Sequence, residues 1–227
     1  MCKYKVNPCT RLYKYFASFY FAMLILNFMW MNNAMLCIFW IAYGVIHSAL
    51  ATSKVKRYST DRLGISEMSY RLFYNILAIV TLLPLVYFGF YKNDLQIFKK
   101  NLSTDIFGFL VFLIGLVMMI LIIKKYFAQM SGTSTEIKDE LHIEGLHKHV
   151  RHPLYLGTFL LLIGLLLYRP QLNVLISTIV IILYTIFATR WEEKKLLIKF
   201  GAKYTEYCAS TPRIIPRFFA KRKNSTT

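Results

Sequence analysis

Residues 154–189 read LYLGTFLLLIGLLLYRPQLNVLISTIVIILYTIFAT, and this stretch decides the fold. Two apolar runs, 154–168 and 173–189, flank a short polar break, Arg169-Pro170-Gln171, and neither run carries a charged residue. A helix needs roughly 20 apolar residues to cross a bilayer. The stretch therefore predicts a helical hairpin in a membrane, with two short arms that are tilted or only partly cross it.

Four further apolar runs precede this hairpin, at residues 12–31, 34–52, 71–90 and 106–123. Hydrophobic residues make up 56% of the 227, and only 17% are charged. A soluble domain carries about 25% charged residues. The sequence thus predicts an all-α, polytopic helical membrane protein with about six hydrophobic helices in a single membrane domain, residues 1–227.

The first two runs are separated only by Met31-Asn32-Asn33, which predicts a tight turn and an antiparallel pair of helices. The first run follows a basic segment but lacks a small-residue cleavage site. It is therefore expected to remain as a membrane helix rather than to be removed as a signal peptide.

Lys and Arg are distributed unevenly between the two predicted sides of the membrane. With the N-terminus inside, the inner segments hold 24 of the 28 basic residues and the outer loops hold 4. The positive-inside rule then predicts that both termini are cytoplasmic. Segments 124–153 and 190–227 meet at that face, and residues 218–227 form a basic tail suited to anionic headgroups.

The net charge of +17 does not indicate nucleic acid, because the basic residues lie between the apolar runs and no nucleic-acid-binding motif is present. The four cysteines are far apart in sequence and form no CxxC pair, which predicts neither a zinc site nor a disulfide framework. The chain also lacks a GxGxxG, Walker A or GxSxG motif. A nucleotide-like cofactor would have to be held without a Rossmann domain.

Residues 139–157 contain four of the five histidines in the chain. Pro153 suits the first turn of a helix, so His152 is expected to cap that helix beside free backbone N–H groups. Such a helix start attracts an anion, and Arg151 could add a charge-assisted bond. The alternative is a basic cap that anchors the helix to lipid headgroups. The histidines lack HExxH spacing, so no metal is expected.

Glu192 and Glu193 follow the last apolar run. Successive helical residues diverge by about 100°, so only one of the two can face the other helices. That carboxylate would bind a cation or a pair of hydroxyls; the alternative is pairing with Lys195 or Lys199 on a solvated face. His47, inside the second run, is a functional candidate or the partner in an interhelical hydrogen bond.

Two motifs together resemble the isoprenylcysteine carboxyl methyltransferase family and its bacterial relatives, the phospholipid and small-thiol methyltransferases. The first is Arg151-His152-Pro153-Leu154-Tyr155-Leu156-Gly157, and the second begins at Glu192-Glu193 and continues through Phe200-Gly201, Tyr204, Tyr207 and Pro212. The resemblance covers about residues 139–217. Residues 44–51 are similar to those of NnrU-type membrane proteins.

The resemblance implies a helical membrane enzyme that holds S-adenosylmethionine in a cytoplasmic pocket closed by the C-terminal segment. It implies catalytic roles for Glu192 and, on the ground of charge, Arg151. The cofactor-binding residues that it implies are Leu141, His142, His147, His152, Pro153, Tyr155 and Glu192. The implied partners are membrane lipids and a small or lipophilic methyl acceptor, in the inner (plasma) membrane of a bacterium.

The sequence departs from the eukaryotic members at two positions. It has His147 where they carry an aromatic residue, and Ala188 where they carry an acceptor-binding arginine. A prenylcysteine carboxylate is therefore not indicated, and the acceptor stays open among a thiol, a carboxylate and a lipid amine. If a general base is needed, His47, His149 and Glu193 are equal candidates. Two other classes fit the chain: a non-catalytic NnrU-like protein or transporter, and an NADPH-dependent membrane reductase.

Overall fold

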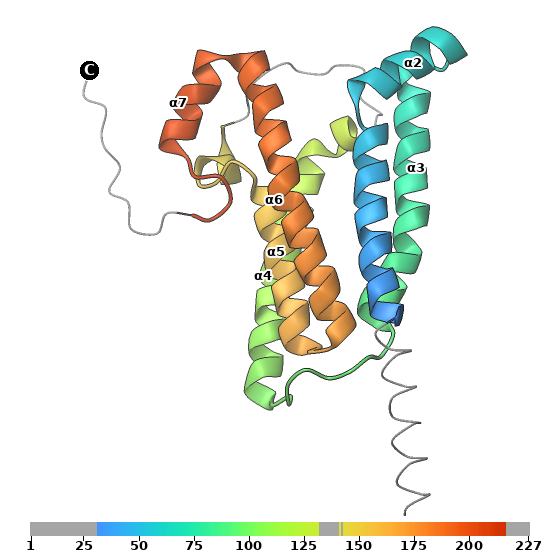
Figure 1. Cartoon of the computed structure of the whole chain (residues 1–227). Helices are drawn as coiled ribbons and strands as arrows, with labels where there is room; N and C mark the ends of the chain where they lie inside the picture. The colour runs from blue at the N-terminus through green and yellow to red at the C-terminus, as the bar shows by residue number, and fades with distance from the viewer. Residues whose placement is uncertain (1–30, 132–140, 142, 217–227) are drawn as a thin grey trace, which may run out of the picture.

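The computed structural model describes residues 31–131, 141 and 143–216, with the side chains of 125–131 excepted. The chain begins there with the helix Met31–Leu50, which leads into α2 (Ser53–Leu63), α3 (Glu67–Val86) and the π-helix η1 (Tyr87–Tyr91). These are followed by α4 (Leu102–Ser131), the 3₁₀-helix η2 (Gly145–Lys148), α5 (Pro153–Tyr168), α6 (Leu172–Phe200) and α7 (Ala202–Ser210) (Figure 1).

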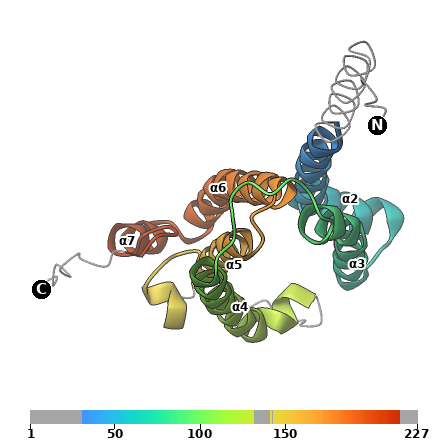
Figure 2. The same cartoon turned by 90° about the horizontal axis from the view of Figure 1, so that it is seen from below.

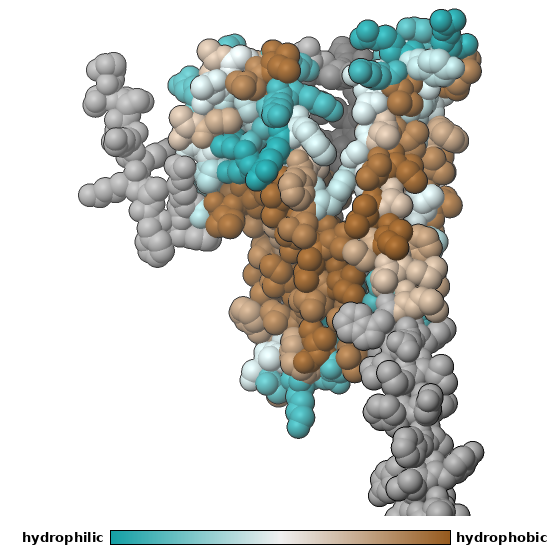
Figure 3. All heavy atoms as spheres, in the orientation of Figure 1, coloured by the Kyte–Doolittle hydropathy of each residue, from teal (hydrophilic) through white to brown (hydrophobic). Residues whose placement is uncertain are grey.

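The described ranges confirm the all-α membrane fold. Four of their helices are long and apolar enough to cross a bilayer: Met31–Leu50, Glu67–Tyr91, Leu102–Lys124 and Leu172–Phe200. α5 is a shorter apolar helix, as the sequence predicts. Hydrophobic residues form a band at mid-height, and hydrophilic residues gather at both ends (Figure 3). The predicted run 12–31 lies outside the described residues except for Met31.

The helices form two groups that meet at α6. Viewed along the helices, α4, α5 and α6 lie together, and α6 adjoins the Met31–Leu50 helix, which pairs with α3 (Figure 2). Trp40 Nε1 donates to Ser177 Oγ at 2.9 Å, and the hydroxyl of Tyr184 donates to the Gly44 carbonyl at 3.0 Å. Polar contacts made by α6 therefore join the two groups.

Four glycines let α4 and α5 pack with their backbones in contact. They are spaced seven residues apart on each helix, as Gly108 and Gly115 on α4 and Gly157 and Gly164 on α5. A Cβ on Gly108 would lie 2.8 Å from the backbone nitrogen of Tyr168, too close for any side chain. Small residues at helix contacts are a common means of close packing in membranes.

The helix bounds correct two expectations. Met31, Asn32 and Asn33 are helical, so the predicted tight turn at 31–33 is wrong. Asn costs a helix less than about 1 kcal/mol, and neither Gly nor Pro is present to end it. α6 continues 11 residues beyond the predicted end at 189, to Phe200. It therefore carries Glu192 and Glu193 on the same continuous helix that crosses the membrane.

The turn between α5 and α6, which we call the tip end, is fixed by side chains that bind backbone carbonyls. The Arg169 guanidinium donates to the carbonyls of Phe90 at 2.7 Å and Tyr91 at 3.0 Å. Asn173 Nδ2 donates to the carbonyls of Phe88 at 2.9 Å and Lys92 at 2.7 Å. These bonds hold the end of the π-helix η1 against the α5–α6 hairpin.

Candidate active site

The start of α5 lies at the opposite end of the molecule, which we call the α7 end (Figure 1). His152 is the N-cap and Pro153 the first helical residue, as predicted. The C-terminal segment after α7 runs beside them: the Arg151 amide donates to the Pro212 carbonyl at 2.9 Å and the His152 amide to the Arg213 carbonyl at 3.0 Å. Residues some 60 positions apart in sequence thus form the wall of one site.

Glu193 is the buried centre of the charged groups at this end. Its carboxylate lies 2.8 Å from Arg151 Nη2 and 2.5 Å from Arg213 Nη2, and it accepts from Arg151 Nε at 2.9 Å. Arg151 Nη1 also donates to the carbonyls of Cys208 and Thr211. The side chains of Arg151 and Glu193 are each 10% exposed. Glu193 therefore clamps the C-terminal segment to the start of α5, and it does not lie on a solvated face.

Glu192 has a different environment from its neighbour. Its side chain is 46% exposed, and its Oε2 accepts a hydrogen bond from the Tyr155 hydroxyl at 3.0 Å. The rings of Tyr155 and His152 stack with their centroids 5.4 Å apart. His152 Nδ1 lies 3.7 Å from Glu192, and its Nε2 lies 3.2 Å from Glu193. His152, Tyr155 and Glu192 thus form one cluster, in which Glu192 keeps acceptor capacity for a ligand.

The electrostatics at this end hold Arg151 charged and His152 neutral. Burial lowers the pKa of His152 below its ordinary 6.5, and the nearby Glu192 and Glu193 carboxylates offset only part of that effect. Burial also opposes the charge on Arg151, but the hydrogen bond and the charge of Glu193 outweigh it and raise the Arg151 pKa. At neutral pH the cluster therefore offers a carboxylate beside a neutral imidazole.

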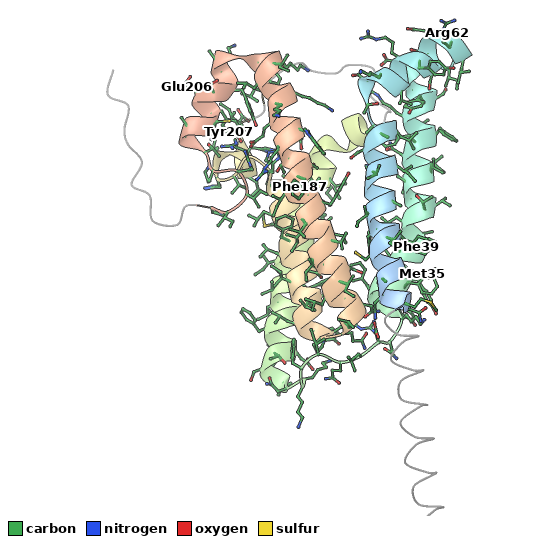
Figure 4. All side chains as sticks on the ribbon, viewed as in Figure 1. Met35, Phe39, Arg62, Phe187, Glu206 and Tyr207 are labelled. Carbon is green, nitrogen blue, oxygen red and sulfur yellow. The ribbon has the colours of Figure 1, made fainter. Side chains whose placement is uncertain are left out.

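Three of the seven predicted cofactor-binding residues lie in this cluster, His152, Tyr155 and Glu192, and a fourth, Pro153, is the first residue of α5 beside it. His147 lies in η2, where its carbonyl accepts a hydrogen bond from Tyr207 at 2.6 Å, and Leu141 is half-buried just before η2. His142 lies outside the described residues. Figure 4 shows Tyr207 and Glu206 on α7, at this end of the molecule.

Sequence reasoning missed the contribution of Arg213 and assigned Arg151 to a ligand. The structure turns both guanidinium groups towards Glu193. A helical phase angle puts Glu192 and Glu193 on different sides of α6, but it does not say which one meets the arginines. The Arg-Glu pairing could have been suspected only from the number of basic residues near the two carboxylates.

Fold and site together define an α-helical membrane protein with a polar cluster where the hairpin α5–α6 meets the C-terminal segment. Residues 103–203 match the model of the phospholipid methyltransferase family. An 80-residue stretch is 38% identical to methanethiol S-methyltransferase 2 of Bradyrhizobium diazoefficiens, covering 34% of this chain and 29% of that protein. No solved structure matches the chain significantly.

These matches confirm the predicted resemblance to integral membrane methyltransferases of the isoprenylcysteine carboxyl methyltransferase type. The matched segment 103–203 holds most of α4, all of α5 and α6, and both halves of the His152–Glu192 cluster. The match with the curated relative spans less than a third of that protein's length.

Proposed function

We propose that this protein is an integral membrane methyltransferase that uses S-adenosylmethionine to methylate a small or lipophilic acceptor. The acceptor is a thiol, a carboxylate or a lipid amine, and the reaction takes place at the α7 end, which the charge distribution predicts to be cytoplasmic. The observation that carries the proposal is the cluster of Glu192, Tyr155 and His152 at the start of α5, inside the segment that matches the family.

The side chains of the cluster fit the chemical groups of this cofactor. A half-exposed carboxylate, Glu192, suits the cofactor's positively charged or hydroxyl groups. The start of α5 has no side-chain cap, so its first backbone N–H groups are available to a carboxylate. The stacked rings of His152 and Tyr155 add an aromatic surface next to Glu192. Leu141, His142 and His147 stay in the proposal as residues of the segment before α5.

The chain's own contribution to the reaction is mainly to bind, to orient and to exclude water. When bound, S-adenosylmethionine supplies an electrophilic methyl group. Tyr155 donates to Glu192 and fixes the orientation of that carboxylate. Arg151 we assign to positioning, because its guanidinium is bound by Glu193 and by backbone carbonyls of the C-terminal segment. A thiolate or carboxylate acceptor needs no base from the protein.

Binding of radiolabelled S-adenosylmethionine to the detergent-purified full chain tests this proposal. We expect saturable binding by the wild type, and a loss of affinity of about tenfold or more, about 1.4 kcal/mol, in Glu192→Gln. His152→Ala should also bind more weakly, because it removes the ring that stacks on Tyr155 and lies beside Glu192. The matched control is Glu206→Gln, since Glu206 is exposed on α7 and lies outside the cluster.

Equal binding of S-adenosylmethionine by the wild type and all three variants would show that the cluster of His152, Tyr155 and Glu192 is not its binding site. If the folded wild type does not bind S-adenosylmethionine, the methyltransferase proposal itself is disproved. NADPH binding would then be measured in the same format, because a membrane reductase is the competing enzymatic class.

A further inference from the structure

The short helix α2 lies where two membrane-spanning helices reach the same surface. Two residues separate it from the end of the Met31–Leu50 helix, and residues 64–66 separate it from the start of α3. It runs across that end of the two helices (Figure 1), and Figure 2 shows it on the opposite side of the molecule from α7. The segment 103–203 that matches the methyltransferase family does not include α2, so the match assigns no role to it.

One side of α2 carries a shallow hollow of about 420 Å³ that is lined only by residues of this helix. The lining residues form three consecutive pairs spaced four positions apart, which places them on one side of the helix. We call this side the basic face. It consists of Ser53, Lys54, Arg57, Tyr58, Asp61 and Arg62. Figure 4 shows Arg62 on this helix, at the top of the molecule.

The three cations of the basic face are not neutralised by the protein. Lys54, Arg57 and Arg62 are exposed, and none has a carboxylate within ion-pair distance among the described residues. The acid on this face, Asp61, accepts a hydrogen bond from the Thr60 hydroxyl at 3.3 Å. Three cations and one carboxylate give the hollow a net charge of +2. It is therefore suited to an anion.

The opposite side of α2, in contrast, is neutralised within the protein. Lys56 Nζ lies 2.6 Å from Glu67 Oε2, and Arg71 Nη2 approaches the same oxygen at 3.7 Å. Successive helical residues diverge by about 100°, so Lys56 lies about 160° round the helix from Lys54. The nearby acid of α3 is thus engaged by cations outside the basic face. An anion that pairs with the basic face has to come from outside the described part of the chain.

Exposed apolar side chains of α2 indicate that this anion is a lipid phosphate. Tyr58, within the basic face, is 61% exposed, and Leu63, about 180° round the helix from Lys54, is 60% exposed. Tyrosine is enriched at the level of the lipid headgroups. A helix that lies in the membrane boundary has an apolar side against the acyl chains and a basic side among the headgroups. Basic residues next to a membrane-spanning helix favour anionic lipids.

We propose that the basic face of α2 binds the phosphate of an anionic phospholipid, at a site separate from the candidate active site. Arg57 and Arg62 supply planar guanidinium donors for the phosphate oxygens, and Lys54 supplies a compact positive charge. The Tyr58 hydroxyl is a further donor in the same hollow. This lipid is bound at the membrane boundary and is not the methyl acceptor, so the proposal does not depend on the proposed function.

Titration of the detergent-purified full chain with phosphatidylglycerol, followed by native mass spectrometry, tests this proposal. Phosphatidylcholine with the same acyl chains is the zwitterionic reference lipid. We expect the wild type to bind phosphatidylglycerol at least about tenfold more tightly than phosphatidylcholine, since each cation near an anionic lipid contributes about fivefold in affinity. The triple variant Lys54→Gln, Arg57→Gln and Arg62→Gln should lose this preference and keep its affinity for phosphatidylcholine.

The matched control is the triple variant Lys194→Gln, Lys195→Gln and Lys203→Gln. It removes the same charge from exposed lysines of α6 and α7, at the same end of the molecule but outside the hollow. This control should keep the preference for phosphatidylglycerol to within about twofold. Equal losses of preference in the two triple variants would overturn the proposal, because they would show that the lipid responds to the net charge of the protein and not to the basic face.

Soluble competitors identify the source of the anion. Inorganic phosphate in large excess should displace phosphatidylglycerol only weakly, because it lacks the acyl chains that hold the lipid at the boundary. Complete displacement would overturn the lipid assignment in favour of a soluble phosphate compound, and tighter binding of polyglutamate would overturn it in favour of an acidic protein partner. S-adenosylmethionine binding should be unchanged in the α2 variant, so the lipid site and the proposed function are tested by different measurements.

Discussion

The two ends of the helical hairpin are both rich in polar contacts, but they are built differently. At the tip end, Arg169 and Asn173 donate mainly to backbone carbonyls of the segment 88–92. At the α7 end, Arg151 just before α5 and Arg213 of the C-terminal segment both pair with Glu193 of α6. Next to this ion-pair cluster, Glu192 stays half-exposed.

The contrast separates a structural role from a binding role. Backbone carbonyls at the end of the π-helix need hydrogen-bond donors. At the tip end these donors are one charged group, the Arg169 guanidinium, and one neutral group, the Asn173 amide. At the α7 end a buried ion pair is not in itself a large source of stability. It does hold three segments in one arrangement, and it does so beside a carboxylate that is left available to a ligand.

Replacing the buried glutamate should have the largest effect. In Glu193→Ala, Arg151 would remain as a buried charge without its carboxylate, which costs about 3–5 kcal/mol of folding stability. We expect a large drop in Tm by circular dichroism in detergent, together with lost cofactor binding. Glu192→Ala, at the next position, should leave the Tm nearly unchanged while weakening binding. Similar Tm losses in Glu193→Ala and Glu192→Ala would show that these two residues do not differ in structural role.

Removing the main donor at the tip end should have an intermediate effect. Arg169→Ala loses the bonds to the carbonyls of Phe90 and Tyr91, at a cost of about 2 kcal/mol. We expect a lower Tm and unchanged affinity for S-adenosylmethionine, measured on the same preparation at a temperature where the variant is folded. A change in affinity larger than the change in folded fraction would show that the two ends are not separate in role.

The protonation of His152 should have the smallest effect on folding stability. Because burial holds its pKa below 6.5, the unfolded chain binds this proton more readily than the folded one as the pH falls below that value. His152 thus contributes stability above about pH 6.5 that is lost as the pH drops through its folded pKa. The groups facing it are Glu192, Glu193 and Arg151.

The measurement is the Tm of the wild type and of His152→Gln across this pH range. The wild type should lose more stability on acidification than the variant, whose side chain can still hydrogen-bond to Glu193 but does not titrate. Parallel pH profiles in the two proteins would contradict the neutral state assigned to His152.

Those parts of the fold that depend on local sequence could be predicted well. Long apolar runs reveal membrane helices because few other structures can satisfy the backbone in a bilayer. The bounds of α5, the turn at Arg169-Pro170-Gln171 and the cap at His152 follow from one apolar run and one proline. The segment 31–33 is the exception: its two asparagines predict a turn, but these residues lie in the first turn of the described helix Met31–Leu50.

Features that depend on distant partners could not be read from the sequence. Glu193 is buried because Arg151 and Arg213 approach it from 42 residues before and 20 residues after in the chain. No local sequence pattern predicts the cavity that lies between the Met31–Leu50 helix and α3, because most of its lining residues come from two separate apolar helices of ordinary composition. The sequence singles out His47 but not the two rings that contact it, the stacked Tyr43 and the tilted Tyr74.

α6 runs from Leu172 to Phe200 without a glycine or a proline. At 1.5 Å per residue it is about 43 Å long, longer than the hydrocarbon core of about 30 Å. On this one helix Tyr184 binds the Gly44 carbonyl of the Met31–Leu50 helix, and Glu192 and Glu193 lie two to three turns further on. The two carboxylates therefore stand at a height that is set by the length of this helix and not by a loop.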